Sequence, residues 1–103
     1  MSSEGLHVPR EKLSKTTLLR HYAITSLIEE LEAVDWYRQR ADDCEDESLR
    51  EILLHNAREE LEHASMVLEW LRRNDAEVDA NLREYLFKAG SITGHEEEAT
   101  GRT

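Results

Sequence analysis

The sequence predicts an all-α protein with two long antiparallel helices and one short C-terminal helix. Of its 103 residues, 35% are charged, 4 are glycine and 1 is proline, which is typical of long solvated helices. Apolar residues recur at spacings of three and four, the period of a helix that buries one face. A chain of this length has difficulty burying enough apolar surface alone. We therefore expect a second copy to complete a four-helix arrangement.

Net charge, apolar content and cysteine content argue against several classes of protein. The net charge of -10 argues against nucleic acid and anionic membranes, because both need basic surface. No apolar run approaches the ~18 residues of a membrane span, and the N-terminus lacks the apolar core of a signal peptide. Cys44 is the single cysteine, so no internal disulfide is expected. We expect a soluble intracellular protein with an acidic surface suited to cations.

The chain divides into three expected regions. Residues 1–13 have mixed charge and no sustained period, so we expect a flexible N-terminal arm. Residues 14–90 carry the periodic apolar pattern and form the expected helical domain. Residues 91–103 are acidic and polar, which predicts a disordered C-terminal tail.

The first long helix is expected from about Ser14 to about Ala41. Its length of ~27 residues corresponds to roughly 40 Å. Its apolar residues fall on one stripe at helical spacing. The stripe consists of Ala23, Ile24, Leu27, Leu31 and Val34.

The second long helix follows a short acidic connection, residues 42–47. Ser48 and Glu51 form a capping-box pattern that restarts the chain as a helix, which extends to about Arg73. Because the connection is short, the two long helices are expected to run antiparallel. The stripe of the second helix consists of Leu49, Leu53, Ala57, Ala64, Leu68 and Leu71.

A third, shorter helix is expected after a second capping-box pattern, Asn74 with Glu77. It extends to about Lys88, and Gly90 is a plausible C-terminal stop. Its inward residues are Val78, Leu82, Tyr85 and Leu86.

Glu60 and His63 are three residues apart in the second helix, and Glu30 lies in the first. An advance of roughly 100° per residue places Glu60 within the apolar stripe and the other two residues at the edges of the buried faces. A carboxylate among aliphatic side chains is costly unless it is paired, protonated or bound to metal. Two carboxylates with one imidazole suit iron or manganese, whereas thiolates suit structural zinc. The three residues are therefore candidate metal ligands.

This cluster is half of a carboxylate-bridged di-metal site. Such sites in helical bundles need two halves, so we expect the same three residues of a second copy about a twofold axis. The ligands leave the ion and the oxidant open, and a di-metal peroxidase or a manganese protein is an alternative. Another is a non-enzymatic helical adaptor, in which the three side chains form a buried hydrogen-bonded network.

Two more acidic sets lie on the outer faces of the long helices. Solvated surface charge is the alternative reading of both, although exposed carboxylates also concentrate cations. The set on the second helix has ligand spacing for one cation and consists of His55, Glu59 and Glu62. The set on the first helix consists of Glu29, Glu32 and the large aromatic Trp36. Calcium or other divalent ions are the candidates for these outer carboxylates.

Four runs of sequence resemble the encapsulated ferritins. They are EELEAVDWY at 29–37, EELEH at 59–63, LEWLRRND at 68–75 and YLF at 85–87. The resemblance covers most of residues 20–88 and implies a ferritin-like four-helix arrangement that forms only on dimerisation. It also implies a ferroxidase that oxidises Fe(II) to Fe(III) with dioxygen at a di-iron centre between two chains.

The resemblance further implies homodimers assembled into a ring, a decamer, inside an encapsulin shell that stores the oxidised iron in the cytoplasm. The family's shell-docking peptide, of the Gly-Ser-Leu type, does not occur in the 103 residues. Carried over by position, the ferroxidase ligands are Glu30, Glu60 and His63. Tyr37 is the implied hydrogen-bond partner of a ligating carboxylate. The implied entry site is Glu29 and Glu32 beside Trp36, and the implied peripheral site is His55, Glu59 and Glu62.

Overall fold

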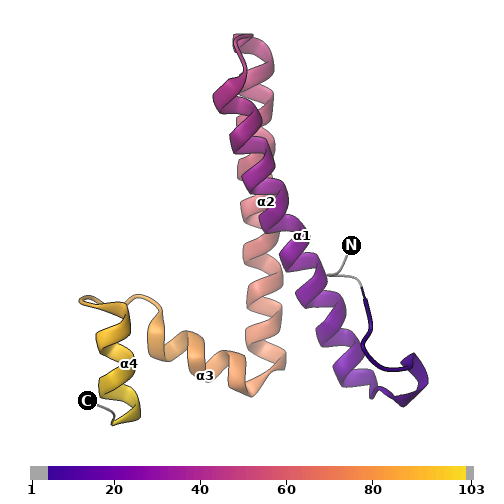
Figure 1. Cartoon of the computed structure of the whole chain (residues 1–103), viewed down its shortest axis with the longest axis vertical. Coiled ribbons are helices and arrows are strands. Elements are labelled where there is room, and N and C mark those ends of the chain that lie inside the picture. The colour runs from indigo at the N-terminus through magenta and orange to yellow at the C-terminus, as the bar shows by residue number, and fades with distance from the viewer. Residues whose placement is uncertain (1–4, 102–103) are drawn as a thin grey trace. The chain divides into compact units, whose positions relative to one another are not determined.

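The computed structural model describes residues 5–101, and these are all-helical with no strand. The elements are the 3-10 helix η2 (Arg10–Lys12) and the helices α1 (Lys15–Asp43), α2 (Glu47–Asn74), α3 (Ala76–Tyr85) and α4 (Ile92–Thr100) (Figure 1). The all-α prediction is confirmed. The chain divides after Trp70 into two compact units, which we describe separately. Within the described range, no helix is both long enough and apolar enough to cross a membrane.

The first unit is a hairpin in which α1 and α2 run antiparallel, side by side (Figure 1). The Ser14 side chain accepts a hydrogen bond from the backbone N–H of Thr17 and begins α1. The cap of α2 is Asp46 rather than the expected Ser48, because the Asp46 carboxylate accepts from the N–H of Leu49 at 2.9 Å. Aspartate and serine are equally good N-caps, so the pattern alone does not choose between them.

The hairpin buries only a narrow seam. Val34, Ala57 and Ala64 of the predicted stripes are buried, as is Ala41. Other stripe residues are exposed, namely Ile24 at 45%, Leu31 at 49% and Leu49 at 48%. Two helices cover each other along one line of contact, and small residues there allow a close approach. Each helix therefore leaves some large apolar side chains uncovered in a single chain, including Ile28 on α1 and Ile52 on α2.

The described part of the N-terminal arm holds one helical turn, η2. Arg10 donates a hydrogen bond to the Tyr22 hydroxyl, and its guanidinium carbon lies 5.6 Å from the centroid of the same ring. This cation–π contact ties the arm to α1. Residues 1–4 of the arm lie outside the described range, and the flexibility of the arm stays a prediction.

In the second unit, α3 begins one residue later and ends earlier than the sequence predicts. Its cap is Asp75 rather than Asn74, and the Asp75 carboxylate accepts from the N–H groups of Glu77 and Val78. The helix ends at Tyr85 because Phe87 adopts a left-handed backbone, with φ 60°. A left-handed residue just beyond the last turn terminates a helix, so the stop precedes Gly90.

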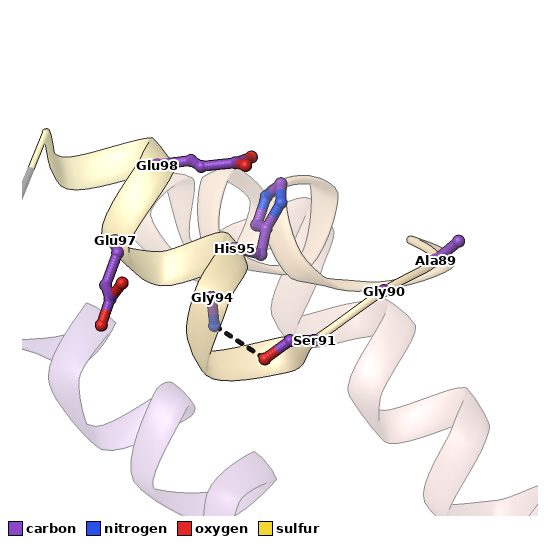
Figure 2. A pocket seen from close by; sticks show the side chains of 7 residues that line it. All are labelled: Ala89, Gly90, Ser91, Gly94, His95, Glu97 and Glu98. Atoms are coloured by element: carbon purple, nitrogen blue, oxygen red, sulfur yellow. Dashed lines mark hydrogen bonds between the residues drawn. The ribbon is translucent and has the colours of Figure 1, made fainter. Parts of the chain in front are cut away.

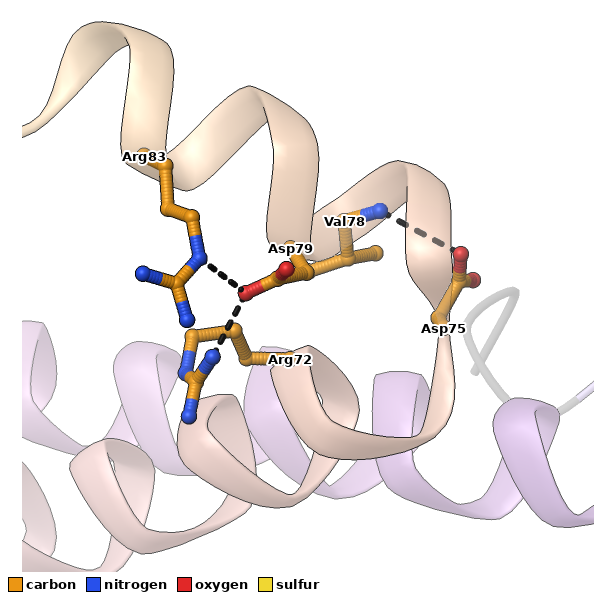
Figure 3. A network of polar contacts seen from close by, with 5 residues as sticks. All are labelled: Arg72, Asp75, Val78, Asp79 and Arg83. Carbon is orange, nitrogen blue, oxygen red and sulfur yellow. Dashed lines mark hydrogen bonds and ion pairs between the residues drawn. The ribbon is translucent and has the colours of Figure 1, made fainter.

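A carboxylate between two guanidinium groups joins α3 to the last turn of α2 within this second unit. Asp79 Oδ1 accepts from Arg72 Nη1 at 2.5 Å and from Arg83 Nε at 2.9 Å (Figure 3). The hydrogen bond from Arg72, together with that from Arg83, lowers the pKa of Asp79. The charged form of the carboxylate is thus favoured in the folded state.

The helix α4 corrects the prediction of a disordered tail at 91–103. The Ser91 hydroxyl accepts from the N–H of Gly94 at 3.0 Å (Figure 2), and Gly101 closes the other end with φ 74°. The His95 ring also packs edge-on against Tyr85 of α3, with centroids 5.4 Å apart. Two caps and a contact with α3 outweigh the polar composition on which the prediction relied. Residues 102 and 103 lie outside the described range.

Substituting Asp79→Asn should destabilise α3 at pH 7. Because folding lowers the pKa of Asp79, its stabilisation is present above the unfolded pKa of about 3.9 and is lost as pH falls through the lower folded value. Hydrogen exchange of the α3 amides should therefore be faster in the variant at pH 7, with the difference shrinking below about pH 3.9. Glu45→Gln, an exposed carboxylate in the connection before α2, is the control. A pH-independent difference would contradict the ion pairs.

Candidate metal centre

The hairpin brings Glu30 of α1 together with Glu60 and His63 of α2. One ligand atom from each residue lies within 4.8 Å of the other two. Glu60 and His63 are neighbours on one helix face because they are three residues apart, and the antiparallel α1 places Glu30 opposite them. Over residues 5–101, this is the one group of three or more acidic, histidine or cysteine side chains close enough to share a metal ion.

The cluster lies at the edge of the buried seam. Glu30 and Glu60 are half-buried and His63 is exposed. Glu30 Oε1 is buried and has no hydrogen-bond partner, while Glu60 Oε1 lies 3.9 Å from His63 Nδ1. A buried carboxylate oxygen without a partner is unfavourable. This oxygen is therefore available to a cation, and the donor set fits a divalent metal ion.

The surroundings of Glu30 favour its protonated form. Burial raises the pKa of Glu30, the neighbouring Glu60 carboxylate raises it further, and His63 acts in the opposite direction. A metal ion supplies the positive charge that this pair of carboxylates lacks. A metal ion at the cluster would therefore compete with a proton on Glu30.

The outer set on α1 combines two carboxylates with one large aromatic side chain. Glu29 is exposed and Glu32 is half-buried, with a buried Oε1 that has no hydrogen-bond partner. Trp36 is 47% exposed. The role of this set as an entry site stays a prediction.

The outer set on α2 contains one close pair. His55 Nε2 lies 3.3 Å from Glu59 Oε1, and Glu62 is exposed. Glu59 and Glu62 line an open hollow of about 600 Å³ that His63 and Met66 also line. The hollow thus joins this outer set to one member of the central cluster, while its role as a peripheral metal site stays a prediction.

Tyr37 is half-buried on α1, and the Arg40 guanidinium lies 5.6 Å from its ring centroid. This cation–π contact fixes the position of the ring. A hydrogen bond from Tyr37 to a ligating carboxylate stays a prediction.

Sequence reasoning missed a polar hollow beside α4. It measures about 390 Å³ and is lined by His95, Glu97 and Glu98 together with the start of the helix (Figure 2). His95 Nε2 lies 3.7 Å from Glu84 of α3. The hollow does not gather three ligand atoms as the central cluster does. The caps Ser91 and Gly101 are the sequence signals that would have revealed the helix.

A helical hairpin that places one Glu opposite a Glu-x-x-His pair has the architecture of a ferritin-like protein. The chain belongs to the EncFtn-like family, whose model matches residues 5–89.

Similar proteins agree with this assignment. The chain is 57% identical over 95 residues to the "Encapsulated ferritin-like protein" of Rhodospirillum rubrum, covering 92% of this chain and 68% of that one. It is 35% identical over 99 residues to the "Encapsulin nanocompartment cargo protein EncC" of Myxococcus xanthus, covering 92% and 75%. The crystal structure of protein ne0167 from Nitrosomonas europaea matches with a TM-score of 0.82 and 51% identity, covering 85% and 97%.

Substituting Glu30→Gln should stabilise the metal-free protein at pH 7. Folding raises the pKa of Glu30, so its contribution to stability is full below the unfolded pKa of about 4.3 and is lost as pH rises through the raised value. Glutamine mimics the protonated form. The variant should therefore melt at a higher temperature than the parent at pH 7 and at the same temperature well below about pH 4.

Added Mn(II) should reverse that order, because only the parent retains the carboxylate ligand. Glu51→Gln, which removes an exposed carboxylate elsewhere on α2, is the control. If Glu30→Gln melts below the parent at pH 7 without metal, the carboxylate is not destabilising and the burial argument is wrong.

Proposed function

We propose that the protein is a ferroxidase that oxidises Fe(II) to Fe(III) with dioxygen at a centre formed by Glu30, Glu60 and His63. The observation that carries the proposal is the convergence of these three side chains within 4.8 Å, with a buried Glu30 oxygen lacking a partner. Fe(II) is the substrate, and each ion gives up one electron to the oxidant. Membership of the EncFtn-like family supports an iron-handling role.

The chemistry of the ligands supports iron as the substrate. Two carboxylates provide hard oxygen donors, which favour Fe(III) over Fe(II), and the imidazole adds a nitrogen donor that also suits Fe(II). Half-burial of Glu30 and Glu60 limits the water that competes for the ion. The exposed side of His63 leaves one face of the cluster accessible.

The complete centre is proposed to lie between two chains. One chain supplies two carboxylates and one histidine, which is half of the set that a di-iron site in a helical bundle uses. A second copy related by a twofold axis supplies the same three residues. The uncovered apolar surface of the hairpin supports this, because a second hairpin would bury it. We further propose that such dimers assemble into a ring, a decamer.

The outer carboxylates are proposed to guide cations to the centre. Glu29 and Glu32 beside Trp36 form the proposed entry site. His55, Glu59 and Glu62 form the proposed peripheral site, which takes calcium or other divalent ions. A net charge of -10 supports such attraction, because acidic surfaces raise the local concentration of cations.

Storage of the product is proposed to occur in an encapsulin shell in the cytoplasm. Two relatives support this: one is named as encapsulated and another as an encapsulin nanocompartment cargo protein. A helical hairpin has no interior of its own in which mineral can accumulate. Iron oxidised at the centre would therefore be delivered to a separate compartment.

Substituting Glu60→Ala or His63→Ala should slow aerobic Fe(II) oxidation by roughly tenfold or more, since each removes a ligand. The measurement is the appearance of the ferric product by absorbance after anaerobic loading with Fe(II) and exposure to air. Glu97→Ala removes a carboxylate of α4 outside the cluster and should oxidise iron at the parental rate. Parental rates in both ligand variants would overturn the assignment.

Fe(II) should strengthen self-association, because an ion held by two chains binds only the assembled state and stabilises it by mass action. Sizing with light scattering under anaerobic dilution should show the parent dissociating at a lower concentration with Fe(II) than without it. His63→Ala should show no such shift. An active chain that remains monomeric throughout would contradict the shared centre.

A further inference from the structure

The hairpin carries an apolar groove between α1 and α2 that is separate from the metal cluster. Its volume is about 410 Å³, within the range of roughly 300–1,000 Å³ found for ligand pockets. The groove is therefore large enough for one aromatic side chain. Its apolar and aromatic lining consists of Leu19, Tyr22, Ala23, Met66, Val67 and Trp70.

Phe87 is an aromatic side chain in an unfavourable setting. It is fully exposed, at 103%, and it occupies the left-handed position that ends α3, with φ 60°. Glycine adopts this conformation without steric cost, whereas the Cβ of any other residue crowds the following carbonyl oxygen. The chain thus bears a cost in conformation and another in exposed apolar surface at the same residue. An outlier of this kind points to a function outside α3 itself.

We propose that the groove of one chain receives Phe87 of a second copy. The groove offers aromatic faces and the thioether of Met66, both of which attract an aromatic ring. Each chain carries one groove and one Phe87, so identical copies satisfy one another with none left over. Burial of an aromatic anchor in a pocket is typical of the residues that dominate binding energy at interfaces.

The groove also adjoins the surface around His63, where the proposed function places a second copy. Met66 lines both the groove and the hollow that contains His63. This continuity matters only if the proposed function holds, because that function places a second copy at His63. The contact itself uses none of the three metal ligands, so it is measured on metal-free protein, where failure of ferroxidase activity has no effect.

The substitution Phe87→Gly distinguishes two roles of Phe87, namely binding to a second copy and ending α3. Glycine suits the left-handed position, so α3 should be protected from hydrogen exchange as well as or better than in the parent. Self-association, measured by light scattering on dilution, should weaken about tenfold or more. Ile92→Ala truncates another exposed apolar residue, at 78%, and should leave association unchanged. Unchanged association in Phe87→Gly with intact helices would overturn the proposal.

A cross-link tests the partner surface directly. In a Cys44→Ser background, a chain with Leu19→Cys in the groove is mixed with a differently tagged chain that carries Phe87→Cys. Mild oxidation should join the two tags in one disulfide-linked product. Leu19→Cys with Ile92→Cys is the matched control and should give little of it. Equal yields from the two mixtures, or no product that contains both tags, would contradict the docking of Phe87 in a second copy.

Discussion

The contact between α1 and α2 is the constraint on which the rest of the structure depends. Two helices bury one line of side chains, and here small residues such as Ala57 and Ala64 occupy it. The close approach that they allow puts Glu30 opposite Glu60 and His63. The same narrow seam leaves the cluster half-open and leaves apolar residues on both helices uncovered. The cluster of candidate ligands and the uncovered apolar surface therefore have one physical origin.

Assembly of the cluster opposes the stability of the single chain. Burial beside a second carboxylate raises the pKa of Glu30, and one of its oxygens lacks a partner. Functional sites commonly retain such unfavourable arrangements because a ligand relieves them. A bound cation would relieve both at once, and the proposed metal binding would then be linked to pH and to stability through this residue.

The helical period of the sequence predicts the long helices and the residues that share a helix face. It does not predict where a helix begins or ends when neighbouring residues are equally good caps. The two long helices and the sharing of a face by Glu60 and His63 follow from a period of 3.6 residues. The period does not locate the start of α2, because Asp46 and Ser48 are equally good N-caps and it is Asp46 that accepts from the N–H of Leu49. The acidic, polar composition of residues 91–103 does not predict α4. That helix depends on its caps and on the packing of His95 against Tyr85. Exposure of the stripe residues Ile24, Leu31 and Leu49 reflects the number of helices that pack together, which the helical period does not predict.

The most direct test of the central claim is the anomalous scattering of iron in crystals of the iron-loaded protein. The account predicts iron peaks at an interface between two chains, with Glu30, Glu60 and His63 from both chains around them. Iron held within a single chain, or absent from these three side chains in crystals that contain bound iron, would contradict a centre shared by two copies.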